Sequence, residues 1–181
     1  MMTYRKIKIY SLIIFVLIPS SCKKVDKLTQ FTMPYDASVT IKSTTGINLP
    51  FDLLTPDITT NSESTFSLNN TRADLVQQIK LTKLTLTVSS PANGDFSFLK
   101  SIAIYISAGG QSETKVAWYD NVPASPGKTI ELQTTDTDLK DYIKQDSFTL
   151  RLSTVTDKLL TTDHTINIHT EFFVDAKILG V

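Results

Sequence analysis

The stretch Ile166-Asn167-Ile168-His169-Thr170-Glu171-Phe172-Phe173-Val174-Asp175-Ala176 is the longest alternating run of apolar and polar residues in the chain. One parity carries Ile166, Ile168, Phe172, Val174 and Ala176, and the other carries Asn167, His169, Glu171 and Asp175. Successive side chains of a β-strand point to opposite faces of a sheet, so this spacing predicts a strand with one buried and one solvated face. Such one-sided strands are typical of antiparallel sheets.

Shorter runs with the same period lie upstream. Their apolar positions are Val39 and Ile41, Ile47 to Leu53, Phe66 and Leu68, Leu84 to Val88, Ile102 to Ile106, Val116 and Trp118, Ile130 and Leu132, and Phe148 to Leu152. Pro50 cannot donate to a β-ladder and predicts an edge position for its strand. Gly109-Gly110, between two runs, predicts the tip of a β-hairpin. About nine strands with this pattern predict an all-β protein, an antiparallel β-sandwich that resembles immunoglobulin-like sandwiches in architecture only.

Two segments break the period and predict one or two short helices. Thr71 to Gln78 begins with residues spaced like a capping box. The parity of the apolar residues changes between Leu81 and Leu84, which indicates either a bulge near Lys83 or a helix that continues to about Lys80. Asp136 to Lys144 has helical apolar spacing, and we expect its helix to cross from one sheet to the other.

The N-terminus has the composition of a secretory signal. Arg5, Lys6 and Lys8 precede the apolar run Ile9 to Ile18, and Pro19-Ser20-Ser21 follows it. A basic start, a short apolar core and small residues before a cleavage point are typical of such signals. The apolar run is about half the length that a membrane span needs.

Cys22, the only cysteine, follows immediately. The pattern resembles a bacterial lipoprotein signal of the Bacteroidota type, and the resemblance implies that the Cys22 thiol carries a lipid such as palmitate. Lys23 stands where the inner-membrane retention signal has Asp, so the expected place is the outer membrane, facing the periplasm rather than the cell surface. We expect a signal peptide at 1–21, a lipidated tether at 22–36 and a β-sandwich domain at 37–181.

Size and charge narrow the functional classes. Removal of residues 1–21 from the 181 leaves 160 residues, enough for one domain with its own core. This mature chain has fifteen basic and eighteen acidic residues, a net charge of about −3. Binding to phosphates needs a concentrated basic face, so we do not expect a nucleic-acid partner. If Cys22 is acylated, no thiol remains for a disulfide.

Motifs for metals, phosphates and catalysis have simpler structural interpretations. Pro126-Gly127-Lys128-Thr129 precedes a strand, whereas a phosphate loop must precede a helix. His164 and His169 should point to opposite faces of one strand, so we interpret them as surface residues and not as metal ligands. Asp136, Asp138 and Asp141 suit the first turn of a helix better than a calcium loop. We therefore expect no enzyme activity, no metal and no cofactor.

Exposed aromatic residues are the remaining candidates for a binding site. Trp118 shares the parity of Val116, which places Trp118 in the core, and Tyr105 and Tyr119 would then share the outer face of a hairpin. Exposed tyrosines can stack on sugar rings or anchor a protein partner. The leading hypothesis is a lipid-anchored, non-enzymatic binding or structural accessory of the cell envelope. The alternatives are a glycan-binding module and a small envelope hydrolase.

Overall fold

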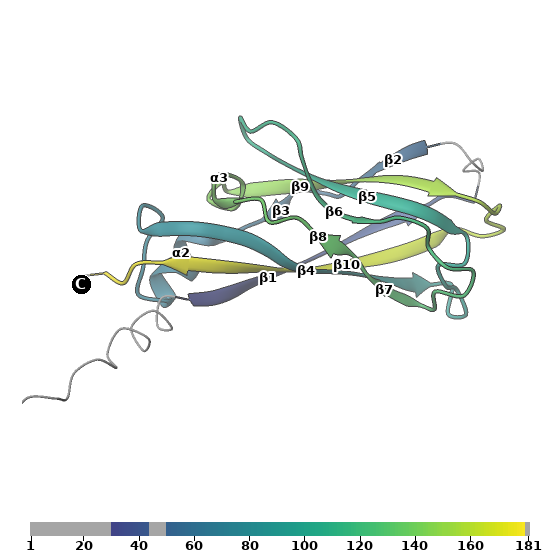
Figure 1. The fold of residues 1–181 in the computed structure, drawn as a ribbon, viewed down its shortest axis with the longest axis horizontal. Helices are drawn as coiled ribbons and strands as arrows, with labels where there is room; N and C mark the ends of the chain where they lie inside the picture. Colours follow the sequence, from purple (N-terminus) through teal and green to yellow (C-terminus); the bar gives the residue numbers. More distant parts are fainter. Residues whose placement is uncertain (1–29, 44–49, 180–181) are drawn as a thin grey trace, which may run out of the picture.

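The computed structural model, which describes residues 30–43 and 50–179, has two antiparallel β-sheets packed face to face (Figure 1). The four-stranded sheet consists, in spatial order, of β1 (Gln30–Ile41), β10 (His164–Ala176), β4 (Val76–Ser90) and β7 (Thr129–Glu131). The six-stranded sheet consists of β2 (Pro50–Leu54), β9 (Ser147–Thr156), β5 (Leu99–Ala108), β6 (Thr114–Tyr119) and β8 (Gln133–Thr134), with β3 (Ile58–Thr59) also pairing with β9. The predicted all-β sandwich is confirmed, with ten strands in the described residues where about nine were expected.

Alternation along each strand explains the core. In β10 the five apolar residues of the even parity are buried, and in β9 Phe148, Leu150 and Leu152 are buried while their neighbours are half-exposed. The two inner faces interlock around aromatic side chains, with Tyr35, Phe148 and Phe172 in mutual edge-to-face contact. Because the long strands each bury one face, the two sheets stabilise each other.

The bulge predicted near Lys83 is present in β4. Glu171 pairs with Lys83, and the next residue of β10, Phe172, pairs with Leu81, so Thr82 is the additional residue. The bulge keeps Ile79 and Leu81 on the inner face together with Leu84, Leu86 and Val88, and all five are buried. A bulge is needed because the apolar parity changes within a single strand.

The helices differ from the sequence expectations. The strand expected at Phe66 and Leu68 is wrong, because these residues belong to helix α2 (Ser62–Leu68). The helix expected over Thr71 to Gln78 is also wrong: the Thr71 hydroxyl donates to the carbonyl of Lys177 at 2.7 Å, and β4 begins at Val76. Long-range pairing of β4 with β10 therefore overrides the local capping pattern.

The second of these segments, Asp136 to Lys144, forms only the single turn α3 (Lys140–Ile143). Its neighbours β8 and β9 belong to the same sheet, so α3 does not carry the chain between sheets as expected. The chain changes sheets at Leu132 instead, the one residue between β7 and β8. Leu132 is buried, which is consistent with a passage across the core.

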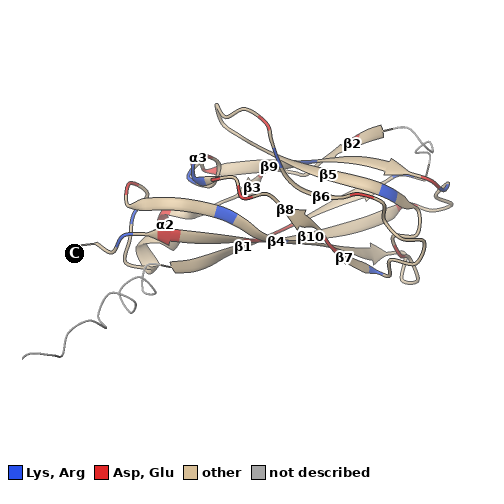
Figure 2. Cartoon of the chain, viewed as in Figure 1, with Lys and Arg blue, Asp and Glu red and all other residues tan. Residues whose placement is uncertain are grey.

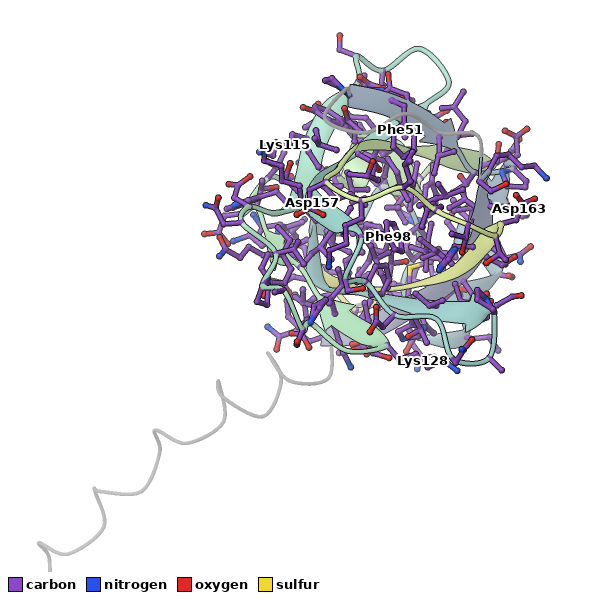
Figure 3. All side chains as sticks on the ribbon, turned by 90° about the vertical axis from the view of Figure 1, so that its right-hand side faces the viewer. Phe51, Phe98, Lys115, Lys128, Asp157 and Asp163 are labelled. Carbon is purple, nitrogen blue, oxygen red and sulfur yellow. The ribbon has the colours of Figure 1, made fainter. Side chains whose placement is uncertain are left out.

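The sandwich has two distinct ends. At the end where β1 starts, which we call the Gln30 end, Gln30 pairs with Asp175, and the amide of Leu179 donates to the carbonyl of Asn70 at 2.9 Å. Helix α2 lies at this end too, with Phe66 6.3 Å from Phe31 (Figure 1). At the opposite end Phe98 lies between the sheets and closes the core (Figure 3).

Strand β1 starts earlier than the sequence indicated. Residues 30–36, which the sequence places in the tether, form the first part of β1 and pair with β10. Among the described strands, β1 is at the edge of its sheet, and it contains Pro34, opposite Glu171. The predicted edge position of the strand with Pro50 is confirmed for β2, whereas Ile47, Leu49, Cys22 and the signal segment lie outside the described residues. None of the helices in the described residues is long and apolar enough to span a bilayer.

Candidate functional site

The two tyrosines predicted to share an outer face lie on opposite faces of the six-stranded sheet. Strands β5 and β6 form the expected hairpin, but their register shifts between Ile104 and Tyr105: Ile104 pairs with Ala117, and Tyr105 pairs with Lys115. Val116 is the additional residue, and it is buried together with Ala117. This bulge reverses the parity of the residues that follow it.

Trp118 and Tyr119 consequently exchange the roles that the sequence assigned to them. Tyr119 pairs with the inward-facing Ile102 and packs against the core, so its predicted outer position is wrong. Trp118 pairs with Ala103 on the outer face and is half-exposed, so its predicted core position is wrong too. The outer face therefore holds Tyr105 and Trp118.

Tyr105 is covered by Arg151. The guanidinium carbon of Arg151 lies 4.2 Å from the centre of the Tyr105 ring, in a cation–π contact. Arg151 also donates two hydrogen bonds to the carboxylate of Glu113, at 2.8 and 2.6 Å, and one to Asp52 at 2.9 Å. The hydrogen bond from Arg151 holds the pKa of Glu113 below its usual value. One ring face of Tyr105 is thus covered by Arg151, and the charge of Arg151 is paired with Glu113 and Asp52.

Trp118 is covered less closely than Tyr105. The Lys115 ammonium lies 4.9 Å from the indole centre, and Lys115 itself is exposed. The register places Arg151, Tyr105 and Lys115 side by side across three strands, with Trp118 diagonal to Tyr105. We call these four residues the aromatic row. It offers a flat surface for stacking and hydrogen bonding, and it positions no nucleophile next to a base.

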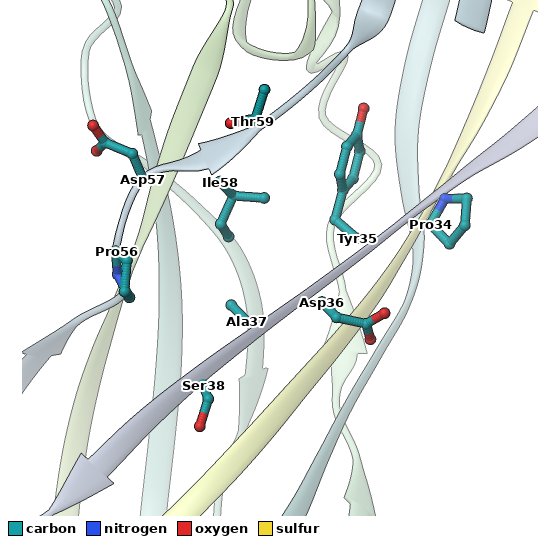
Figure 4. Close-up of a pocket in the computed structure, with 9 residues that line it drawn as sticks. All are labelled: Pro34, Tyr35, Asp36, Ala37, Ser38, Pro56, Asp57, Ile58 and Thr59. Carbon is teal, nitrogen blue, oxygen red and sulfur yellow. The ribbon is translucent and has the colours of Figure 1, made fainter.

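A shallow pocket lies between the edge strand β1 and the segment that contains β3 (Figure 4). Tyr35 donates its hydroxyl hydrogen bond across this gap to the carbonyl of Thr60 at 2.9 Å. Burial raises the pKa of Tyr35 above its ordinary value, because the charged phenolate would lose its hydration. Tyr35 therefore stays uncharged, and its hydrogen bond links the two sheets.

A second shallow pocket lies on the outer face of the four-stranded sheet and includes His169. His169 Nδ1 is 2.8 Å from Asp36, and its Nε2 is 3.5 Å from Glu171. Glu171 also accepts a hydrogen bond from Lys83 at 3.1 Å, which lowers the pKa of Glu171. These contacts join three neighbouring strands across their solvated face.

The two histidines do point to opposite faces, as predicted, but His164 is not a surface residue. It is only 8% exposed, stacks edge-on against Phe98 at 5.0 Å between ring centres, and contacts the carbonyl of Thr162 at 2.9 Å. His164 is the first residue of β10 and packs against Phe98, which explains why it is buried. Within residues 30–43 and 50–179, no three His, Cys, Asp or Glu side chains are grouped so that they could hold a metal ion.

The acidic residues near α3 have structural partners. One oxygen of Asp138 accepts hydrogen bonds from the amides of Ile79 and Lys140, at 3.0 and 3.1 Å, and the other accepts one from the Lys140 ammonium at 2.8 Å. Burial alone would raise the pKa of Asp138, but these hydrogen bonds outweigh it and lower the pKa. Asp141 lies in the first turn of α3, as expected, and Asp136 contacts Lys80 at 3.4 Å.

Pro126-Gly127-Lys128-Thr129 is a turn before a strand, as predicted. Gly127 has a φ of 82°, and β7 begins at Thr129. A positive φ is the conformation for which glycine is suited, so Gly127 serves the turn.

Comparisons with known proteins give little. No family model matches the chain, and no curated protein matches it. Among solved structures, one titled "Desmodium yellow mottle tymovirus" aligns with a TM-score of 0.30 and 13% identity, covering 99% of this chain and 96% of that one. An empty head of turnip yellow mosaic virus aligns with a TM-score of 0.31 and 12% identity, covering 97% and 92%. TM-scores this low support no conclusion about function.

Proposed function

We propose that this chain is a lipid-anchored protein of the bacterial cell envelope, attached through Cys22, whose β-sandwich serves as a non-enzymatic binding or structural accessory. The observation that carries the proposal is the order along the sequence: a secretory signal, a cysteine at its end and a domain whose first strand begins at Gln30. Only residues 23–29 separate Cys22 from that strand. A cysteine so close to the domain is suitably placed to tether it to a bilayer.

The described side chains support an accessory role. The charged clusters around Arg151, His169 and Asp138 each join neighbouring strands or elements, so the fold itself accounts for them. In the view of Figure 2, basic and acidic positions are interspersed over the described ribbon. The outer membrane, facing the periplasm, is the proposed place, because Lys23 departs from the inner-membrane retention signal.

Metabolic labelling with radioactive palmitate tests the anchor. The full-length chain should take up label and partition with the membrane fraction, because two or more acyl chains anchor a protein stably. The Cys22→Ala chain should carry no label. A Cys22→Ala protein that is still labelled, or a wild-type protein that keeps its leader and remains water-soluble, would contradict the proposal.

Glycan binding is the second candidate, favoured by the position of Trp118 on the outer face. An indole beside Tyr105 and polar side chains is a suitable surface for a sugar ring. A glycan array with the protein lacking residues 1–22 tests it. Trp118→Ala should abolish any signal, and Phe173→Ala, on the outer face of the other sheet, should leave it unchanged. Signals that do not respond to Trp118→Ala would reject the aromatic row as a glycan site.

A further inference from the structure

The Gln30 end of the sandwich exposes two leucines. Leu68, at the end of α2, is 84% exposed, and Leu179, after β10, is 46% exposed. The two lie in adjoining segments, because the Leu179 amide bonds the carbonyl of Asn70, two residues after Leu68. Two solvent-exposed leucines in adjoining segments are a candidate contact for an apolar or interfacial surface.

The length of the tether places this end near any bilayer that holds Cys22. From Cys22 to Gln30 the chain can span at most about 29 Å when fully extended. Strand β10 alone, with 13 residues, is about 40 Å long. The opposite end can therefore touch the bilayer only if the sandwich lies on its side, on a sheet face or a sheet edge.

The outer sheet faces are unsuited to lying on lipid. The four-stranded sheet presents the cluster of Asp36, His169, Glu171 and Lys83, and the six-stranded sheet presents Arg151 with two carboxylates. At the Gln30 end the charges of segments 62–75 and 177–179 balance, with Glu63 and Asp74 against Arg72 and Lys177, and Asp175 lies opposite Gln30. Among the exposed residues that the structure describes at this end, Leu68 and Leu179 are the large apolar ones.

We propose that the Gln30 end rests on the bilayer surface, with Leu68 and Leu179 inserted among the lipid headgroups, so that the sandwich stands upright. This inference rests on the proposed anchor at Cys22. It makes the ends inequivalent: the segments 91–98 and 157–163 at the opposite end face away from the membrane and are available to partners. Two leucines are a weak anchor alone, so they orient the domain while the acyl chains hold it.

Quenching by brominated lipids tests the orientation in the mature, acylated protein reconstituted in vesicles. Cys22 is the only natural cysteine, so Leu68→Cys introduces a single reactive thiol for a fluorescent label when Cys22 is acylated. Two other exposed leucines provide matched controls: Leu54, at the edge of the six-stranded sheet and 68% exposed, and Leu159, at the opposite end and 67% exposed. All three positions are solvent-exposed, so the substitutions should leave the fold intact.

The expected result is severalfold stronger quenching at position 68 than at positions 54 and 159. Equal quenching at all three positions, or the strongest quenching at position 54, would overturn the upright orientation while leaving the anchor in place. Mass spectrometry of the same preparation separates the two proposals. A Cys22 without acyl mass would overturn the proposed anchor and, with it, the orientation.

Discussion

Arg151 contacts three side chains on the outer face of the six-stranded sheet, and these contacts link separate parts of the chain. Its guanidinium stacks on Tyr105 and binds Glu113 and Asp52, which come from different parts of the chain. A planar guanidinium can make both kinds of contact at once, whereas an ammonium cannot. The side chain therefore joins β2, β9 and the segment before β6.

Replacement of Arg151 by Met should change the acid dependence of stability. In the wild type the pKa of folded Glu113 is lowered, so this interaction stabilises the protein above the ordinary pKa of glutamate and is lost as the pH falls through the lowered value. In Arg151→Met the pKa of Glu113 should return toward its ordinary value. NMR titration of the Glu113 carboxyl measures this, with Lys115→Met as the control that leaves it lowered. An unchanged titration in Arg151→Met would show that another group lowers the pKa.

At the scale of elements, the register shifts between strands determine which residues face the core, and two of them, in β4 and β6, decide the assignments made from the sequence. The bulge in β4 could be predicted, because apolar parity changes between Leu81 and Leu84 and a single strand cannot bury both sets otherwise. The bulge in β6 could not, because Val116 and Ala117 are both small and apolar, so either parity fits. That ambiguity is why Trp118 and Tyr119 were assigned to the wrong faces.

The helices were hard to predict for a related reason. In α2 only Phe66 is a buried large side chain, and one apolar anchor defines no period. In α3 a single turn is held largely by Asp138, whose carboxylate connects α3 to β4 through the amide of Ile79. The sequence showed the acidic residues but not this long-range partner.

Asp138→Ala should destabilise the protein by about 1–3 kcal/mol, because the substitution leaves two amides without their charged acceptor. The free energy of unfolding from urea denaturation measures the loss. Asp136→Ala is the matched control, since Asp136 is almost fully exposed and its loss should cost less than about 0.5 kcal/mol. Equal losses for the two variants would contradict the role of Asp138.

At the scale of the whole molecule, strand alternation was sufficient to predict the layered architecture. The alternation of apolar and polar residues identifies the inner face of β10 and of most other strands, β6 excepted, without any knowledge of the pairing order. The order of strands and the change of sheets at Leu132 depend on contacts between distant segments. Those contacts leave no local pattern in the sequence, so they cannot be predicted from it.

The central aromatic cluster should contribute most to the cooperativity of the fold. Phe172 is fully buried between Tyr35 and Phe148, so Phe172→Ala should lower the free energy of unfolding by about 3–5 kcal/mol. Phe173→Ala, one residue later on the outer face, should cost less than half as much. Urea denaturation of the two variants, with comparable slopes, makes the comparison. A larger loss at Phe173 would place the core on the wrong side of β10.

The edge position of strand β1 affects how copies of this protein would associate on a membrane surface. If the chain is anchored as proposed, its copies collide sideways far more often than copies in solution, and a long edge strand invites them to join through backbone hydrogen bonds. Pro34 has no backbone N–H and so interrupts the row of hydrogen-bond donors along this strand. The Tyr35 hydroxyl donates to the carbonyl of Thr60 and so links this strand to the segment after β3. The domain is thereby suited to dense coverage of a surface as separate molecules.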